Sequence, residues 1–385
     1  MTLKEQEKQA CLAIDAIQDE LRTVAMEIHS HPELGLEEQY AVKTIKKFLE
    51  AHQFQTTVGV GNIQELNTAM QGDYVENDSR QPTDLRKMAF LGEYDALPGL
   101  GHGCGHNLIA LMSLGGAIGF SRSAGPNWMT TFFGCPAEET IGGKVYMADV
   151  GLFGGYEAAL IIHPGGENEI GGTSLAAHPL EVTYHGQSAH IASLTDSGIN
   201  ALDCVVDLYQ AIKEMKQSFP KGAIVGAIVT DGGTAPNVVT FKATLRMTVR
   251  GATVDDLENI ILPAIKHKAS EIACEYGATV DMHHYEPLFK DMKQDEWLLR
   301  IFSQVMTEFG ESPRQLPPDE ADGSTDVGNV SYEVPTAQPT LSIGLGLEAH
   351  TLAFTEAAGS IYGLDQAIKG AKIMAIAALR FASIL

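Results

Sequence analysis

Basic residues are scarce in this chain. The 385 residues include 26 lysines and arginines against 49 aspartates and glutamates, which leaves 49 − 26 = 23 net negative charges. Nucleic acids and anionic membranes are bound by clustered positive charge. The composition therefore argues against both as partners. It says little about a small substrate, because a local pocket can oppose the overall charge.

Cysteines and long apolar runs are also scarce. The five cysteines are odd in number and scattered, which favours free thiols in a reducing compartment over a disulfide framework. The first 20 residues are polar and charged, without the apolar core of a signal peptide. No run reaches the ~18 apolar residues of a membrane span. We therefore expect a cytoplasmic location.

What the chain does have is enough apolar sequence for large cores. Apolar residues make up 44% of the chain and charged residues 19%, so the sequence does not resemble a disordered one. At ~150 residues per domain, the length suggests two or three domains.

Strands and helices alternate in the first part of the chain and return after residue 290. The pattern predicts helices at 3–29, 37–52, 108–120 and about 359–382, strands at 88–92, 128–135, 158–162 and 340–343, and a surface loop at 71–86. This alternation predicts an α/β domain with a parallel or mixed sheet covered on both faces.

The middle of the chain follows a different order. Strands are expected at 180–184, 223–230, 238–249 and 279–284, and helices at 200–216 and 254–275. The order βαββαβ is typical of a small, ferredoxin-like α+β domain. The sequence thus predicts a discontinuous catalytic domain of residues 1–175 and 290–385, with an inserted domain of residues 176–289.

Residues that can bind metals follow several of the expected strands. In open α/β sheets, ligands bind beyond the carboxyl ends of the strands. Such ends are followed by Cys104 and His106, by Glu138 and Glu139, by His163 and by His350. Zinc accepts sulfur, nitrogen and carboxylate oxygen together. The set therefore suits a metal centre near these strand ends.

Each of these residues also has another interpretation. Cys104 and His106 could merely pack in a glycine-rich turn, or Cys104 could be a nucleophile with His106 or His102 as its base. Glu138 and Glu139 could form a ligand and a general base, or the acidic first turn of a helix. His163 could be structural. The sequence has no Gly-x-Ser-x-Gly elbow and no phosphate loop ending in Gly-Lys-Ser or Gly-Lys-Thr.

Five segments in a fixed order carry a family resemblance. They are His31-Pro32-Glu33-Leu34-Gly35, Glu93-Tyr94-Asp95-Ala96-Leu97-Pro98, Gly101-His102-Gly103-Cys104-Gly105-His106-Asn107, Pro136-Ala137-Glu138-Glu139 and Gly186-Gln187-Ser188-Ala189-His190. With them, the chain resembles the aminoacylase/carboxypeptidase-G2-like metallopeptidases of the M-twenty family. It is most similar to the amidohydrolase branch, subfamily D, with the aminoacylase-1-like-2 and p-aminobenzoyl-glutamate hydrolase proteins.

The resemblance implies a fold, two metal ions and a set of residue roles. The catalytic domain would be of the zinc-peptidase type, with a phosphorylase/hydrolase-like mixed sheet, and the inserted domain would be a lid that also forms a homodimer. Two divalent ions, zinc or manganese with cobalt as an alternative, would be held by Cys104, His106, Glu139, His163 and His350. Glu138 would be the general base toward a metal-bridging water.

Further roles follow from the same resemblance. His190 would reach the partner subunit's active site to bind the oxyanion, and Asn237 would contact the substrate. Asp95 and Asp326 would fix the orientation of the metal-binding side chains without binding the metals themselves. From charge alone, Arg246 or Arg250 is a candidate for binding a substrate carboxylate, although an exposed or structural role suits either arginine at least as well.

These expectations lead to a function and two alternatives. The chain would hydrolyse the amide bond of small N-acyl or N-aroyl amino acids or dipeptides. The alternatives are a cysteine hydrolase that uses Cys104, and a non-catalytic binding protein or partner subunit of the same fold.

Overall fold

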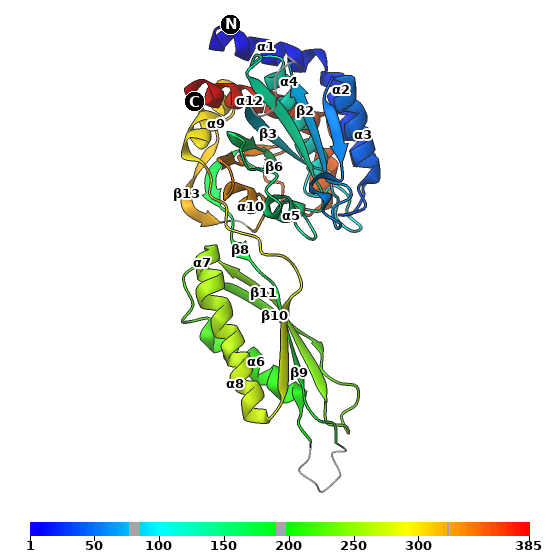
Figure 1. The fold of residues 1–385 in the computed structure, drawn as a ribbon, viewed down its shortest axis with the longest axis vertical. Coiled ribbons are helices and arrows are strands. Elements are labelled where there is room, and N and C mark those ends of the chain that lie inside the picture. The colour runs from blue at the N-terminus through cyan, green and yellow to red at the C-terminus, as the bar shows by residue number, and fades with distance from the viewer. Residues whose placement is uncertain (77–84, 190–197, 322) are drawn as a thin grey trace. The chain divides into compact units, whose positions relative to one another are not determined.

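The computed structural model describes residues 1–76, 85–189, 198–321 and 323–385. They pack into two compact units (Figure 1). Unit 1 comprises Met1–Thr173, Met292–Glu320 and Asn329–Leu385, whereas unit 2 comprises Ser174–Asp291 and Ala321–Gly328. The chain therefore leaves unit 1 to build unit 2 and then returns.

Unit 1 contains two mixed sheets. The first has the strand order β1-β2-β4-β3-β5-β14, in which β4, β3, β5 and β14 run parallel and β1 and β2 are antiparallel to their neighbours. Its strands are β1 (Gln55–Val58), β2 (Met70–Val75), β3 (Arg86–Glu93), β4 (Trp128–Cys135), β5 (Ala158–Leu160) and β14 (Thr336–Ala337). The second, in spatial order, has β13 (Arg314–Ala321), β7 (Glu169–Thr173), β15 (Thr340–Ser342) and β6 (His163–Gly165).

Helices surround these sheets. They are α1 (Leu3–Ala16), α2 (Gln18–Ser30), α3 (Gln39–Ala51), the short turn η1 (Val60–Asn62), α4 (His106–Ser121), α5 (Gly143–Asp149), α9 (Glu296–Glu308), α10 (Val327–Ser331), α11 (Leu352–Ala358) and α12 (Ile361–Ile384). Every residue of α4 is buried, as expected of a helix that is apolar on all sides. A Cβ on Gly115 would lie 2.6 Å from the Cβ of Ala371, so the glycine lets α12 approach α4 closely.

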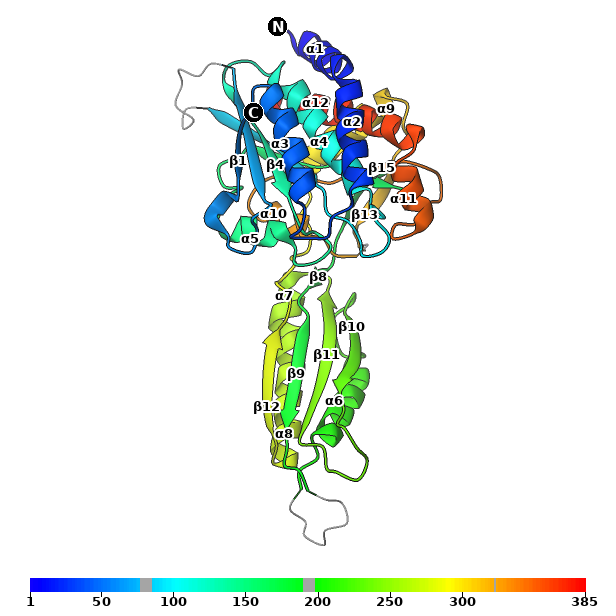
Figure 2. The ribbon, with the colours of Figure 1, turned by 90° about the vertical axis from the view of Figure 1, so that its right-hand side faces the viewer.

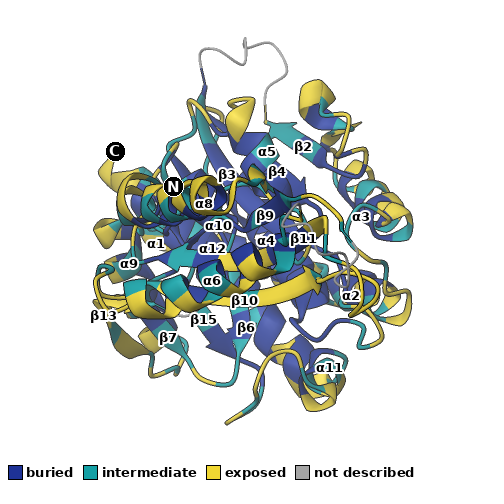
Figure 3. Cartoon of the chain, turned by 90° about the horizontal axis from the view of Figure 1, so that it is seen from below, coloured by how far each residue is buried: buried dark blue, intermediate teal, exposed yellow. Residues whose placement is uncertain are grey.

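The apolar runs of β3 and β4 explain why these strands lie inside. All eight residues of β4 are buried, and the last six residues of β3 are too (Figure 3). Strands that are covered on both faces are apolar along their whole length rather than alternating. The core of unit 1 therefore extends up to the carboxyl ends of these two strands.

Two local expectations for unit 1 were wrong. The expected helix at 3–29 is two helices, which part at Ile17, where the backbone N–H bonds to Ile14 O. Of the expected loop at 71–86, residues 71–75 form most of β2, where Gln71 Nε2 and Thr131 Oγ1 both donate to the Asp73 carboxylate, and residues 77–84 lie outside the described residues. Polar residues can thus occupy this strand.

Unit 2 is a four-stranded antiparallel sheet in the order β10-β11-β9-β12, with β8 paired to β11 (Figure 2). Its elements are β8 (Ala176–Ala177), β9 (Leu180–His185), α6 (Ala201–Met215), β10 (Ile224–Asp231), β11 (Lys242–Gly251), α7 (Val254–Asp256), the π-helical turn η3 (Leu257–Ile261), α8 (Leu262–Tyr276) and β12 (Thr279–His284). Buried residues of α6 and α8 form its core with the sheet.

These features confirm the expected fold class, a mixed α/β structure combined with a ferredoxin-like βαββαβ unit. Within the described residues, no helix has both the length and the apolar character needed to cross a membrane.

Candidate functional site

The candidate site lies in unit 1, at the carboxyl ends of parallel strands. Glu93 ends β3 opposite Cys135, which ends the neighbouring strand β4. The Glu138-Glu139 pair follows Cys135 closely, and His163 follows β5. The strand ends thus bring together residues that are 70 positions apart in the chain.

His106 is at the centre of this cluster. It is the first residue of α4 and is buried. Its Nδ1 donates to Asp95 Oδ1 at 3.0 Å, and its Nε2 lies 3.5 Å from Glu93 Oε2 without a hydrogen bond to any described residue. Asp95 therefore fixes the orientation of the ring, as carboxylates do behind metal-binding histidines.

The electrostatics of His106 reflect its acidic surroundings. Burial opposes a charge on the ring, but Asp95 and Glu93 outweigh this effect and raise the pKa of His106 to about 10. Glu139 Oε1, 3.8 Å from Nε2, acts in the same direction. A site that raises the pKa of a buried imidazole in this way also attracts other cations.

Cys104 lies with Glu139 and His350. Donor atoms of these three residues are all within 4.8 Å of one another. Burial, together with the carboxylates of Glu139 and Glu138, raises the pKa of the Cys104 thiol well above its usual range. Nucleophilic cysteines need a lowered pKa, whereas a bound cation would favour the thiolate. The surroundings of Cys104 therefore suit a metal ligand better than a nucleophile.

His350 reaches the cluster from the loop before α11. Its backbone has a φ of 62°, which is uncommon for a residue other than glycine, and its N–H donates to Gly103 O at 3.0 Å. This bond joins the loop to the segment that carries Cys104. The ring Nε2 lies 3.5 Å from Glu139 Oε1.

A second group of donors lies at the end of β3. Glu93, His106 and His163 have donor atoms within 4.8 Å of one another. The rings of His106 and His163 meet edge to face, with centroids 6.2 Å apart. Lys144, which is fully buried on α5, places its Nζ 2.7 Å from Glu93 Oε1.

The two groups share no residue, so they offer two separate sets of three donors. His106, Glu138 and Glu139 form a further set that connects them. Sulfur, imidazole nitrogen and carboxylate oxygen match the preferences of zinc. Among the described residues, the buried Nε2 of His106 has no hydrogen-bond partner, so a metal ion that binds there displaces no hydrogen bond. The residues therefore fit divalent metal ions.

The structure brings together most of the residues named from the sequence. Unit 1 holds, in one cluster, Cys104, His106, Glu138, Glu139, His163, His350 and Asp95. Asn237, Arg250 and Asp326 belong to unit 2. His190 lies outside the described residues. The roles assigned to all these residues stay predictions.

Three residues of this region were missed in the sequence. Glu93 and Lys144 form the buried ion pair, and Glu38 accepts a hydrogen bond from the backbone N–H of Ala137, next to Glu138. A lysine inside the small-residue stretch Gly142-Gly143-Lys144-Val145 was a usable signal, because a buried lysine requires a partner.

Comparisons with known proteins agree with this arrangement. A family model described as "Peptidase family M20/M25/M40" matches residues 89–380. The chain belongs to this family. It is 30% identical over 382 residues to the Xaa-Arg dipeptidase of Mus musculus, covering 97% of this chain and 88% of the relative. It is 31% identical over 270 residues to a p-aminobenzoyl-glutamate hydrolase polypeptide of Escherichia coli, covering 64% of this chain and 54% of that protein.

A solved structure has the same fold. The chain superposes with a TM-score of 0.70 and 20% identity on a dinuclear metal binding peptidase of the M20 family from Bacillus subtilis, covering 95% of this chain and 99% of that one. Family membership and the named relatives identify the chain as an enzyme that hydrolyses amide bonds.

Proposed function

We propose that this chain is a two-metal amidohydrolase that cleaves small N-acyl or N-aroyl amino acids or dipeptides, with Glu138 as the general base. The observation that carries the proposal is the pair of three-donor groups in unit 1, which share no residue and lie beside Glu138.

The metal ligands in this proposal are Cys104, His106, Glu139, His163 and His350, and the ions are zinc or manganese, with cobalt as an alternative. Glu93, the remaining donor of the second group, stays paired with Lys144. When bound, such ions polarise a scissile carbonyl and stabilise negative charge on its oxygen. Asp95 keeps the His106 ring in position through the 3.0 Å hydrogen bond at Nδ1. The ring nitrogen that remains, Nε2, is then available to the metal.

Glu138 performs the proton transfers. Its carboxylate takes a proton from the attacking water while the new C–O bond forms, and it delivers this proton to the amine nitrogen as the C–N bond breaks. The products are a carboxylic acid and an amine. A general base must lie within reach of the water that it activates. Glu138 meets this requirement if the water lies near His106 and Glu139, whose donor atoms are within 4.8 Å of a carboxylate oxygen of Glu138.

The relatives suggest the substrate class. One is named as a dipeptidase acting on Xaa-Arg and another as a hydrolase of p-aminobenzoyl-glutamate, so both names describe an amide between a small acyl group and an amino acid. The product amino acid carries a carboxylate, which an arginine can bind with two hydrogen bonds. We assign this role to Arg250 and a substrate contact to Asn237.

The two alternatives receive less support. A cysteine hydrolase needs a reactive thiolate, but the surroundings of Cys104 raise its pKa. A non-catalytic binding protein has no use for a base beside the metal ligands, yet Glu138 lies next to them.

Glu138→Gln tests the mechanism. The variant should keep its bound metal, because Glu138 is not a proposed ligand, while kcat falls by ~10²–10⁴-fold. Metal content is measured on the purified protein, and turnover is measured on N-acetyl amino acids, N-benzoyl amino acids and dipeptides that end in arginine. Glu356→Gln, an exposed carboxylate on α11, is the control. A Glu138→Gln enzyme with the parent kcat would refute the mechanism.

Unit 2 also supports a homodimer. β10 is an edge of its sheet, and Ile228 and Val229 on this strand are 64% and 47% exposed. The opposite edge, β12, exposes polar residues instead. An apolar edge strand is a template for pairing with another chain. We therefore propose that β10 pairs with β10 of a second copy.

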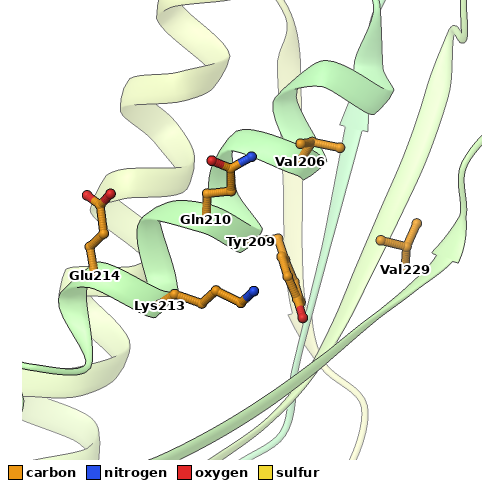
Figure 4. A pocket seen from close by; sticks show the side chains of 6 residues that line it. All are labelled: Val206, Tyr209, Gln210, Lys213, Glu214 and Val229. Atoms are coloured by element: carbon orange, nitrogen blue, oxygen red, sulfur yellow. The ribbon is translucent and has the colours of Figure 1, made fainter.

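A groove beside β10 adds charge complementarity. It is lined by Val206, Tyr209, Gln210, Lys213, Glu214 and Val229 (Figure 4). Lys213 and Glu214 are neighbours on α6, so a two-fold axis can set the lysine of one copy against the glutamate of the other. Ile228→Lys should therefore shift the chain to monomer in sedimentation velocity, whereas Thr279→Lys on β12 should leave the dimer intact. A monomeric parent chain would end this proposal.

The proposed role of His190 depends on such a dimer. His190→Ala should keep its metal and lose turnover. Verified heterodimers of His190→Ala with Glu138→Gln should recover activity, because one of their two sites then has both residues intact. If these heterodimers stay inactive, His190 does not act across the interface.

A further inference from the structure

The turn that carries Glu138 has a strained backbone. Ala137 is fully buried and has a φ of 59°, in the left-handed region that residues with a Cβ seldom adopt. Such conformations persist only where the surrounding structure enforces them, and they are concentrated at functional sites. The contacts that hold Ala137 in this conformation therefore also fix the backbone next to Glu138.

Two buried carboxylates hold the backbone on either side of Glu138. Glu38 Oε1 accepts a hydrogen bond from Ala137 N at 2.8 Å, and Asp95 Oδ2 accepts one from Glu139 N at 3.0 Å. Glu38 is 0% exposed and Asp95 is 1% exposed. Each of these two side chains therefore fixes the direction of one of the two backbone amides that flank Glu138.

Glu38 is itself held from the end of β3. Its Oε2 accepts from Thr68 Oγ1 at 2.8 Å, and Tyr94 Oη donates to Thr68 O at 2.6 Å. Tyr94 precedes Asp95 in the chain. Both carboxylates are therefore connected to the same strand end, which is among the most buried parts of unit 1.

The segment before α3 also contacts the turn directly. A Cβ added to Gly35 would lie 2.9 Å from Ala137 Cα, which is closer than real Cβ atoms approach. The partners of Glu38 that the structure describes are N–H and O–H donors rather than a cation. A buried carboxylate without a cation is an unfavourable choice for packing alone.

We propose that Glu38 is a positioning residue, whose hydrogen bond to Ala137 N holds the turn so that Glu138 points at the attacking water. The inference rests on the proposed role of Glu138. It adds that the position of the base depends on a carboxylate about 100 residues earlier in the chain, with Asp95 holding the other side of the turn.

Two substitutions of Glu38 separate hydrogen bonding from packing. Glu38→Gln keeps an oxygen that accepts from Ala137 N and gains an amide that donates to Thr68 Oγ1. Glu38→Met has a similar length but no acceptor. Displacement of a catalytic group by about 1 Å lowers turnover by up to ~10²-fold. We therefore expect Glu38→Met to lower kcat by about 10- to 100-fold, with KM and bound metal unchanged, and Glu38→Gln to retain most of the parent kcat.

Glu33→Gln is the matched control. The Glu33 carboxylate accepts from Tyr40 N and Ala41 N at 2.9–3.0 Å, so it bonds to backbone amides in the same segment without contacting the turn. Its kcat should equal that of the parent enzyme. A second readout is amide hydrogen exchange in a peptide that contains Ala137, which should accelerate in Glu38→Met and stay slow in Glu38→Gln and Glu33→Gln.

The outcomes separate this inference from the proposed function. If Glu38→Met keeps the parent kcat and slow exchange, or if Glu38→Gln is as impaired as Glu38→Met, the inference is wrong. If Glu38→Met does not fold, Thr68→Val removes one donor from Glu38 and should lower kcat to a smaller extent. An unchanged kcat in Thr68→Val would then count against the inference. If even the parent hydrolyses no amide, the proposed function fails, while the exchange rates still decide whether Glu38 holds the turn.

Discussion

Replacement of Lys144 by methionine should destabilise unit 1 strongly. The Lys144 ammonium lies 2.7 Å from Glu93 Oε1, and both side chains are buried, at 0% and 1% exposure. Methionine fills a similar volume but has no charge, so Glu93 would lose its lysine while remaining out of reach of water. Loss of one partner of a buried pair costs as much as about 3–5 kcal/mol, because the Glu93 carboxylate then keeps only the more distant positive charge of His106, at 3.5 Å.

The pH dependence of this loss has a defined sign. Burial acts to raise the pKa of Glu93, but Lys144, followed by His106 and His163, outweighs it and holds the pKa below its usual value. In the parent chain, Glu93 therefore adds stability above its unfolded-state pKa, and this contribution is lost as the pH falls through the folded-state pKa. In Lys144→Met, the lysine no longer lowers the pKa of Glu93, so the effect of burial raises this pKa. The destabilisation should then be largest at pH 8 and smaller at pH 5.

Urea denaturation of the metal-free chain measures this effect. Both tryptophans, Trp128 and Trp297, belong to unit 1, so their fluorescence reports the unfolding of that unit alone. The control is Lys46→Met, which breaks an exposed pair with Glu50 in the same unit and should cost at most about 1 kcal/mol. Adding Glu93→Gln to Lys144→Met should restore part of the stability. The reasoning fails if Lys144→Met costs no more than the control at pH 8, or if the double variant is no more stable than the single one.

Three further predictions follow from other parts of the chain. Chelation should abolish hydrolysis, zinc or manganese should restore it, and Cys104→Ser should lower the metal-to-protein ratio measured by elemental analysis; turnover that survives chelation would contradict a metal centre. Tyr184→Phe removes a buried hydrogen bond from Oη to Ala269 O, at 3.0 Å, and should destabilise unit 2 by about 1 kcal/mol in calorimetry, with no change in kcat. Burial, with a smaller effect of Asp95, raises the pKa of Glu38 to about 7. The folded parent chain therefore binds this proton more tightly than the unfolded chain does. It should lose about 3 kcal/mol of stability as the pH rises from about 4.5 to about 7, whereas Glu38→Gln should not. Equal pH profiles of unfolding for these two metal-free proteins would show that Glu38 titrates normally.

Apolar periodicity was enough to predict the fold class. The buried runs in β3 and β4 and the βαββαβ order of unit 2 are local patterns that survive in the folded chain. Prediction failed where polar side chains satisfy each other inside the structure. β2 was taken for a loop because Gln71 and Asp73 are polar, yet in the sheet they bond to each other and Thr131 also donates to Asp73.

The candidate site was predictable where its residues lie in segments that follow strands. Cys104, Glu139 and His163 are residue types that bind metals, and they follow predicted strands, so the sequence predicts them as ligands. The fold places their donor atoms in adjoining groups. Glu38 and Lys144 carry no such signal. Their importance comes from contacts with Ala137 and Glu93, which are both far from them in the chain.

The charge balance of the cluster shows why metal binding and stability should be linked. Glu93, Asp95 and Glu139 lie around His106, and Lys144 is the lysine placed among them. In the metal-free chain, the imidazole of His106 carries part of the compensating charge, which is why its pKa rises to about 10. Divalent ions would supply that charge directly and release the proton from His106. Metal binding should therefore release protons at neutral pH. It should also stabilise unit 1, since ions that bind only the folded state shift the folding equilibrium.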